Sequence, residues 1–378
     1  MVPEAQQVRT NTEVVVERGM FLCYRIFDIA DEIDLSRAQS ALSGGSRRMR
    51  LTRAGSEYLQ LPDPPLTVEL GRHPLRLTGG TEEVEAIARV FAHGAVSIIL
   101  RVPMPPGSTL DGLVPLADEL FDSPVVEALS LELVKRLRQD LAPAGLRGTV
   151  WEQSESYTVV YADKLRGDPK ASEVLAAADL GRLLLGEREQ TPLSEQEQAE
   201  VVRTSFSYTE RDLAVIDWNG AFVYEPSGSL DVPDVLEVCN AQLLELRYYD
   251  DVLDRNLKAV YDGLEKPAPA VERIIRSPYR GLARRVMLTL LEMSEFIERV
   301  ENSLKIIGDF YLARVYEGAV KRLRIRQWQA SVTRKQEMLG RVYNLLKGEV
   351  DTDRGLTLEA TIVLLIVVEI VLAFFKIL

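Results

Sequence analysis

The chain has 378 residues, which is long enough for two or three structural units with a sizeable core. Its formal net charge of −12 argues against a protein that coats nucleic acid with its whole surface. Its two cysteines, Cys23 in a strand-like run and Cys239 in a helical one, exclude a framework of disulfides, and both are expected to be buried in a reducing compartment.

Residues 19–225 have the pattern of a mixed α+β domain, as one body or two, behind a flexible N-terminus at residues 1–18. Apolar alternation and turn residues predict strands at 20–28, 47–77, 95–102, 151–162, 205–208, 213–218 and 221–224. Asn219-Gly220, between the last two strands, is a strong hairpin signal. Helical spacing predicts helices at 33–42, 81–90, 172–185 and 194–203, and a helix or a helix pair at 110–141. The helix at 81–90 rests on Thr81 as an N-cap with glutamates in the first turn.

Residues 232–350 have the character of long amphipathic helices. An apolar seam runs from Val235 to Val260 in alternating steps of four and three residues, and similar spacing recurs at 286–307 and 325–346. These helices are expected to form a helical hairpin or a coiled coil, packing on each other or on a second copy. The predicted fold class is therefore α+β, with an N-terminal mixed region, long C-terminal helices and one terminal transmembrane helix.

The predicted transmembrane helix covers residues 356–375, LTLEATIVLLIVVEIVLAFF. Twenty residues make a helix of about 30 Å, which matches the hydrocarbon thickness of a bilayer. Twelve Ile, Val, Leu and Phe residues between Ile362 and Phe375 contribute roughly −4 to −7 kcal/mol to insertion, whereas one central acid costs about +3 kcal/mol. Insertion is favoured over the alternative, a buried helix of a soluble fold, because nothing else in the sequence indicates a core able to cover every face of it.

Glu359 and Glu369 are the ionisable residues of this span, and Glu369 lies well inside it. Acids within a membrane normally face protein, water or a partner group. Glu369 is therefore expected to hydrogen-bond across a homo-oligomer, to meet a polar group of another membrane protein, or to remain on a monomer that tolerates the cost. Ala373, one turn later, leaves room for a close helix approach, which favours the homo-oligomer.

The segment from Arg314 to Lys347 carries nine cations and two acids, a local balance of +7 in a chain of −12. The residues assigned to this basic patch are Arg314, Lys321, Arg322, Arg324, Arg326, Arg334, Lys335 and Arg341. Three hypotheses fit such a patch: it lies against anionic lipid headgroups, it binds RNA or a ribosome, or it covers acidic parts of the same protein. Aromatic residues for base stacking are few, with Trp328 and Tyr343 as the candidates.

The sequence contains no phosphate-binding loop, no dinucleotide fingerprint and no HExxH motif. His73 and His93 are isolated and are interpreted as structural histidines. The acids of residues 250–254 are interpreted as a solvated helix face rather than as metal ligands. The sequence therefore predicts a protein that is not an enzyme, with no cofactor and no metal.

Two stretches resemble the required for meiotic nuclear division protein family. They are residues 358–370, LEATIVLLIVVEI, preceded by the helix at 321–346, and residues 23–35, CYRIFDIADEIDL. The resemblance implies a membrane-anchored protein of unknown biochemical activity. Mitochondrial members form oligomers and support organellar translation, and this role extends to the chain only as an analogy. The chain departs from the family at 93–102, where the expected Trp is absent, and at 240–250, where no serine-rich helix start is found.

The leading hypothesis is a non-enzymatic, tail-anchored scaffold that forms homo-oligomers and presents its mixed domain to a partner. Its partners are then a lipid bilayer and further copies of the chain, with another membrane protein as an alternative. One rival hypothesis is a membrane-tethered factor that binds RNA or a ribosome through the basic patch, and a second is an enzyme with a site between the mixed domain and the helices. Because the N-terminus lacks a presequence pattern, the span is expected to be a single pass in a bacterial inner membrane, with the body in the cytoplasm.

Overall fold

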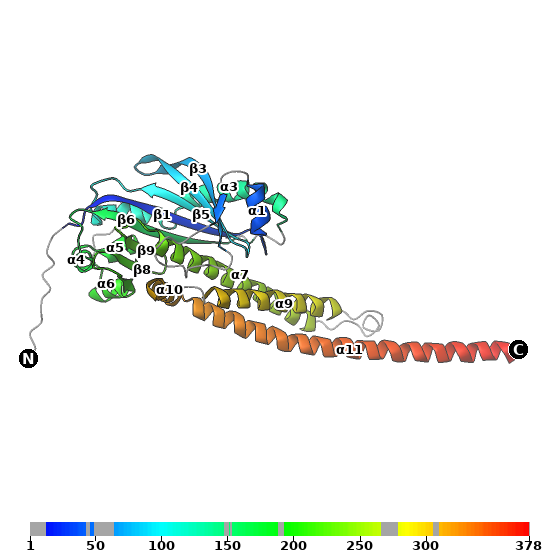
Figure 1. Cartoon of the computed structure of the whole chain (residues 1–378). Coiled ribbons are helices and arrows are strands. Elements are labelled where there is room, and N and C mark those ends of the chain that lie inside the picture. Colours follow the sequence, from blue (N-terminus) through cyan, green and yellow to red (C-terminus); the bar gives the residue numbers. More distant parts are fainter. Residues whose placement is uncertain are drawn as a thin grey trace, which may run out of the picture. The chain divides into compact units, whose positions relative to one another are not determined.

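The computed structural model of the protein describes residues 13–42, 46–48, 64–146, 151, 153–187, 193–265, 279–304 and 310–377. One nine-stranded sheet organises the first part of the chain, with strand order β2-β3-β4-β5-β1-β6-β9-β8-β7 (Figure 1). The strands are β1 Val16–Asp28, β2 Ser46–Arg48, β3 Leu66–Leu77, β4 Gly80–Val90, β5 Ala95–Pro103, β6 Ser154–Leu165, β7 Ser205–Phe206, β8 Leu213–Ile216 and β9 Gly220–Tyr224. Residues 19–225 therefore build a single sheet rather than two.

Neighbouring strands of the described sheet pair antiparallel, except that β6 and β9 are parallel. The central strand β1 is buried on both faces. Phe21 and Cys23 point into the larger core, which contains apolar side chains of α2 and α3, whereas Ile26 packs with Ala241 and Leu244 of α7. Since side chains alternate along a strand, α7 lies against the face opposite to α2 and α3.

The helices are α1 Leu35–Ala41, α2 Val114–Leu120, α3 Pro124–Asp140, α4 Ala171–Ala177, α5 Leu180–Leu185, α6 Glu195–Val202, α7 Asp231–Glu265, α9 Tyr279–Leu304, α10 Phe310–Arg322 and α11 Ile325–Ile377. N-cap serines explain where two of these helices begin: Ser123 and Ser194 accept hydrogen bonds from backbone N–H groups at the starts of α3 and α6. The expected α+β class, with long C-terminal helices, is confirmed.

The helix expected at 81–90 is wrong, because these residues form strand β4. Val84, Ala86, Ala88 and Val90 are buried in the larger core, and Ile87 is buried on the other face. A period of two residues therefore decides the structure, since a helix would spread these apolar side chains around its circumference. The glutamates that resemble the first turn of a helix lie at the hairpin end of β4, next to the Thr78–Gly79 turn.

Other boundaries also differ from those expected. Strand β1 begins at Val16, so the structured chain starts before the predicted limit at residue 18, and residues 1–12 lie outside the described residues. The helix expected at 172–185 is divided into α4 and α5 at Ala178–Asp179. The Asn219-Gly220 hairpin is confirmed, since β8 and β9 pair antiparallel around it.

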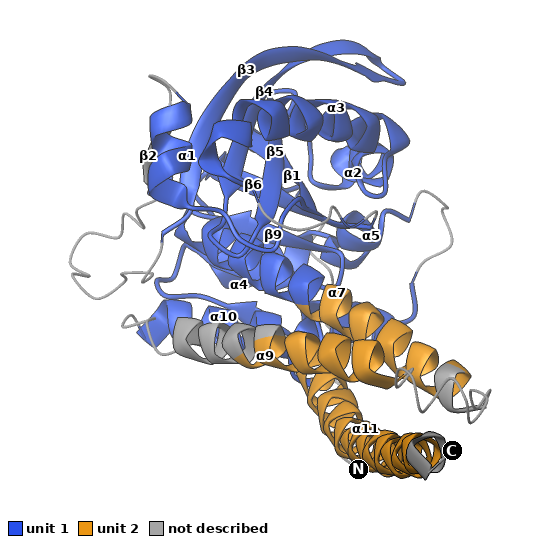
Figure 2. Cartoon of the chain, turned by 90° about the vertical axis from the view of Figure 1, so that its right-hand side faces the viewer, with its two compact units in different colours: residues 1–245, 303–326 blue, residues 246–302, 327–378 orange. Residues whose placement is uncertain are grey.

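The chain forms two compact units: unit 1 contains residues 1–245 and 303–326, and unit 2 contains residues 246–302 and 327–378 (Figure 2). In unit 2, the second half of α7 packs with α9 and with α11. Asn256 Nδ2 of α7 donates a hydrogen bond to Thr289 Oγ1 of α9 at 3.3 Å. Gln336 of α11 donates to Ser294 of α9 at 3.3 Å. These helices pack on each other, as the heptad spacing allowed.

Candidate functional site

The second half of α11 presents an apolar surface that the described residues do not cover. Among the described residues, α11 is the one helix that is long and apolar enough to cross a membrane. Every side chain from Thr361 to Ala373 is exposed, and Leu364 and Leu365 are each 62% exposed. The buried faces of α11 occur earlier, at Leu339 and Leu346. A core helix of a soluble protein would show the reverse pattern, because burial of such side chains drives folding.

The membrane-segment candidates Glu359, Glu369 and Ala373 lie on this exposed part of α11. Glu359 and Glu369 are ten residues apart, about 15 Å along the helix axis, so they occupy different depths in any bilayer that the helix crosses. The helix is continuous from Ile325 to Ile377, so the third amphipathic helix and the terminal span, which the sequence separates, form one element.

The basic patch does not form one helix, because the chain breaks between α10 and α11. Arg324, at the break, has φ of +56°, in the left-handed region that L residues rarely adopt. The patch is therefore divided: Arg314, Lys321 and Arg322 belong to α10, whereas Arg326, Arg334, Lys335 and Arg341 belong to α11.

Arg322 is the most strongly held member of the patch. Its Nε and Nη2 atoms contact Asp217 Oδ1 at 2.8 and 2.6 Å, and its Nη1 contacts Glu200 Oε1 at 2.7 Å. Partial burial opposes the charge of Arg322, but these two carboxylates outweigh it and raise its pKa. Arg322 thus fixes α10 to α6 and to the β8–β9 turn of unit 1, and its charge is used inside the protein.

Two further cations of the patch also meet acids of the same unit. Lys335 Nζ lies 2.9 Å from Asp250 Oδ1 and 2.7 Å from Asp254 Oδ1, both on α7. Arg326 pairs with Glu317. The acidic run at 250–254 is therefore partly explained by Lys335, a long-range pairing that local sequence does not show. Lys321, Arg324, Arg334 and Arg341 are exposed.

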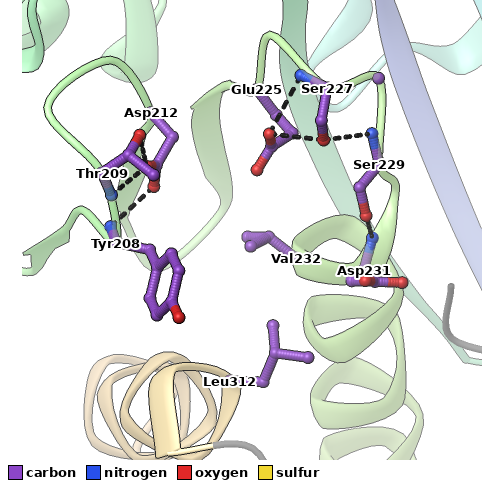
Figure 3. Close-up of a pocket in the computed structure, with 10 residues that line it drawn as sticks. Tyr208, Thr209, Asp212, Glu225, Ser227, Ser229, Asp231, Val232 and Leu312 are labelled. Atoms are coloured by element: carbon purple, nitrogen blue, oxygen red, sulfur yellow. Dashed lines mark hydrogen bonds between the residues drawn. The ribbon is translucent and has the colours of Figure 1, made fainter. Parts of the chain in front are cut away.

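A pocket of about 510 Å³ lies in unit 1 (Figure 3). It is lined by residues of three regions: Tyr208, Thr209 and Asp212 before β8; Glu225, Ser227, Gly228 and Ser229 after β9; and Asp231, Val232 and Leu312 of α7 and α10. Its polar groups bond to one another. Asp212 accepts from the backbone N–H of Tyr208 at 2.8 Å, and Glu225 accepts from Ser227 Oγ at 2.7 Å. These hydrogen bonds hold the turns before β8 and after β9 in place, and the lining residues do not indicate a particular reaction.

A buried charged cluster joins strand β4 to the start of α7. Arg89 lies 2.6 Å from Asp234 Oδ1 and also pairs with Glu237, which is 1% exposed. Burial raises the pKa of Glu237 to about 7 and outweighs the opposite effect of Arg89. Local sequence patterns do not predict this cluster, although an arginine on a strand that is otherwise buried is a signal for a buried partner.

The two histidines are separate. His73 Nε2 lies 3.0 Å from the carbonyl oxygen of Leu70, and the ring of His93 packs on Phe91 with 5.3 Å between ring centroids. Within the described ranges, no three His, Cys, Asp or Glu side chains group as metal ligands do. Cys23 and Cys239 are both buried thiols, as expected.

Comparison with known proteins gives a family but no activity. An uncharacterized protein of Methanocaldococcus jannaschii, MJ0711, is 27% identical over 266 residues, which is 70% of this chain and 74% of the relative. No solved structure matches the chain significantly. Neither result concerns the meiotic nuclear division family, so that resemblance stays a prediction. Residues 18–230, more than half of the chain, match the family described as "Uncharacterized protein MJ0711, N-terminal domain", and the chain therefore belongs to this family.

Proposed function

We propose that the protein is a non-enzymatic scaffold, anchored in a membrane by the second half of α11, that forms homo-oligomers and presents its sheet domain to a partner. The observation that supports the anchor is that every apolar side chain from Ile362 to Leu372 is exposed, around the full circumference of the helix. An apolar surface of this size is expected to be covered by lipid or by protein.

The energy balance supports lipid as the cover. The twelve large apolar residues between Ile362 and Phe375 provide roughly −4 to −7 kcal/mol for insertion, against about +3 kcal/mol for Glu369. Asp351 and Arg354, both exposed, precede the span and set its aqueous boundary. We further propose that the bilayer is a bacterial inner membrane and that unit 1 lies in the cytoplasm, where the thiols of Cys23 and Cys239 stay reduced.

The anchor is tested by fractionation of cells that express the full chain. We expect the protein in the membrane pellet after a high-pH wash, and solubilisation only with detergent. The double variant Leu364→Arg/Val368→Arg adds about +5 to +7 kcal/mol to the insertion cost and should move the protein to the soluble or aggregated fraction. The matched variant Leu364→Ile/Val368→Ile should remain in the pellet. A full chain that stays in solution without detergent, as a defined particle, would refute the proposal.

A second candidate function, binding to RNA or a ribosome, is favoured by the exposure of Arg324, Arg334 and Arg341. Reversal of these three charges to Glu should then abolish salt-sensitive co-sedimentation with ribosomes, because phosphate contacts depend on cations that reach solvent. Arg322 should be left unchanged in this experiment, since its loss would disturb the fold through Asp217. Unchanged sedimentation of the triple variant would exclude this candidate.

A further inference from the structure

One face of α11 carries a row of residues at intervals of seven: Gly348, Gly355, Ile362 and Glu369. All four are exposed, and none contributes to the buried face of unit 2 formed by residues such as Leu346. At 100° per residue, Gly355 lies about 180° around the helix from Leu346. The row therefore faces away from the helices that α11 contacts within its own unit.

A second row runs beside the first, at Leu345, Thr352, Glu359, Ile366 and Ala373. Together the two rows advance in alternating steps of three and four residues, which is the spacing of a helix–helix contact. We call these nine residues the α11 seam. Both acids of the membrane segment lie on the seam, and every seam residue is exposed. Leu345 is 65% exposed, and Met338, seven residues earlier, is also exposed in the aqueous part of the helix.

Packing against the described residues does not require the two glycines of the seam. A Cβ atom added at Gly348 or Gly355 would meet no heavy atom within 4 Å. A glycine inside a helix costs about 1 kcal/mol relative to alanine. The gain that offsets this cost is close approach of a second backbone, which small residues permit.

We propose that the α11 seam is the interface for a second copy of the chain, in parallel orientation, from the membrane surface through the bilayer. This interface rests on the proposed membrane anchor and specifies how the oligomer forms. Two copies inserted in the same sense place identical residues at identical depths. Glu369 of one copy then meets Glu369 of the other, and in the neutral form one carboxyl group donates a hydrogen bond while the other accepts. The contact is isologous, as in a two-fold dimer.

A second copy fits the seam better than an unrelated membrane protein. Glu359 and Glu369 lie about 15 Å apart along the axis, and an unrelated partner would need polar groups at both depths. A parallel copy supplies a carboxyl group at both depths, which pairs when one carboxyl of each pair is protonated, and it also brings Gly348 and Gly355 opposite the same glycines. The seam extends from Leu345 to Ala373, about 42 Å, so the contact continues above the lipid.

The test is disulfide cross-linking of full-length protein in its native membrane. Single cysteines are introduced on the seam by Ile362→Cys or Ile366→Cys, and off the seam by the matched changes Leu364→Cys or Val371→Cys. The natural thiols of Cys23 and Cys239 are buried, so the unmodified chain gives the background. We expect covalent dimers from the seam positions, several-fold above both off-seam positions. Equal cross-linking at the four positions, with the protein in the membrane, would overturn the interface.

Glycine variants provide a second measurement that does not depend on oxidation. Gly348→Leu and Gly355→Leu should lower the dimer fraction of detergent-solubilised protein. Gly340→Leu is the matched control, because Gly340 also has open space around it but lies off the seam. All three changes raise helix propensity, so a loss of dimer in the seam variants alone cannot come from unfolding of the helix. A dimer fraction unaffected by the seam variants would overturn the interface.

The two proposals fail in different ways. If the unmodified protein is absent from the membrane pellet, the anchor is refuted and the parallel interface with it. If the protein is in the pellet but cross-links without preference for the seam, the anchor stands and the interface alone is refuted.

Discussion

Arg322 Nη2 lies 2.6 Å from Asp217 Oδ1, and the Asp217 side chain has no exposed surface. The two residues are 105 positions apart in the sequence. Asp217 also accepts from the backbone N–H of Trp218 at 2.7 Å, and the hydroxyl of Tyr157 donates to the carbonyl oxygen of Gly220 at 2.9 Å. The β8–β9 turn is therefore a fixed polar structure on which Arg322 anchors α10.

Replacement of Arg322 by Ala should destabilise unit 1. The change leaves the carboxylate of Asp217 buried without its cation, for which about 3 kcal/mol is the expected loss of unfolding free energy. Urea unfolding in detergent micelles measures it. Arg326→Ala is the control, since Arg326 and Glu317 are both mostly exposed and should lose less than about 1 kcal/mol. Equal effects of the two variants would contradict the structural role of Arg322.

Replacement of Arg89 by Met should be more costly, because it leaves Asp234 and Glu237 buried without their shared cation. We expect a loss of roughly 3–5 kcal/mol near pH 8. The loss should be smaller near pH 5, since Glu237, whose pKa burial raises to about 7, is then protonated. Arg101→Met, on the adjacent strand, removes a half-exposed pair with Glu85 and serves as the control. A pH-independent loss in the Arg89 variant would argue against this account.

Stability should fall as pH rises through the range set by Asp28. Burial, with a smaller effect from Asp31, raises the pKa of Asp28 from 3.8 to about 7. Between these values the folded protein holds a proton that the unfolded chain has released, so the free energy of unfolding decreases with rising pH.

Asp28→Asn removes the carboxyl group that titrates and should stabilise the protein on the order of 2 kcal/mol at about pH 8, with a much smaller effect at about pH 4. Denaturant midpoints across that range provide the measurement. Glu32→Gln, at an exposed position of the same segment, is the matched control. A profile that is as steep in the Asp28 variant as in the unmodified chain would show that Asp28 does not control it.

Gly94→Ala should severely impair folding. Gly94 has φ of +99°, and a Cβ there would lie 1.4 Å from the carbonyl oxygen of Ala30. Gly107 also has positive φ, +85°, but open space around it, so Gly107→Ala isolates the backbone cost of about 1 kcal/mol. Thermal unfolding should show a much larger loss for the first variant. Similar losses would mean that the turn at Gly94 can move away from Ala30.

Local patterns predict much of this fold, because burial follows the period of each element. The strand at 95–102 and the hairpin at Asn219-Gly220 are correct, since alternation and turn type are local properties. Strand β4 was misread because three glutamates near its start resemble a helical first turn. The alternation of Val84, Ala86, Ala88 and Val90 contained the correct signal.

The ion pairs of the basic patch could not be predicted from local sequence. Charge counting finds the excess of cations at 314–347, but the acids that hold Arg322 and Lys335 come from segments far away in the sequence. The exposed acids Glu359 and Glu369 of α11 are evident from the sequence alone. The alignment of these acids with Gly348 and Gly355, in contrast, depends on α11 being one continuous helix.

That continuity also fixes the helical phase of the chain between the part of α11 that packs in unit 2 and its exposed apolar part. Because α11 has no break from Ile325 to Ile377, one residue inserted between Gly348 and Gly355 would rotate everything after it by about 100° relative to everything before it. A seven-residue insertion would restore the phase to within about 20°. The number of residues between two positions of this helix therefore determines the angle between their side chains around the helix axis.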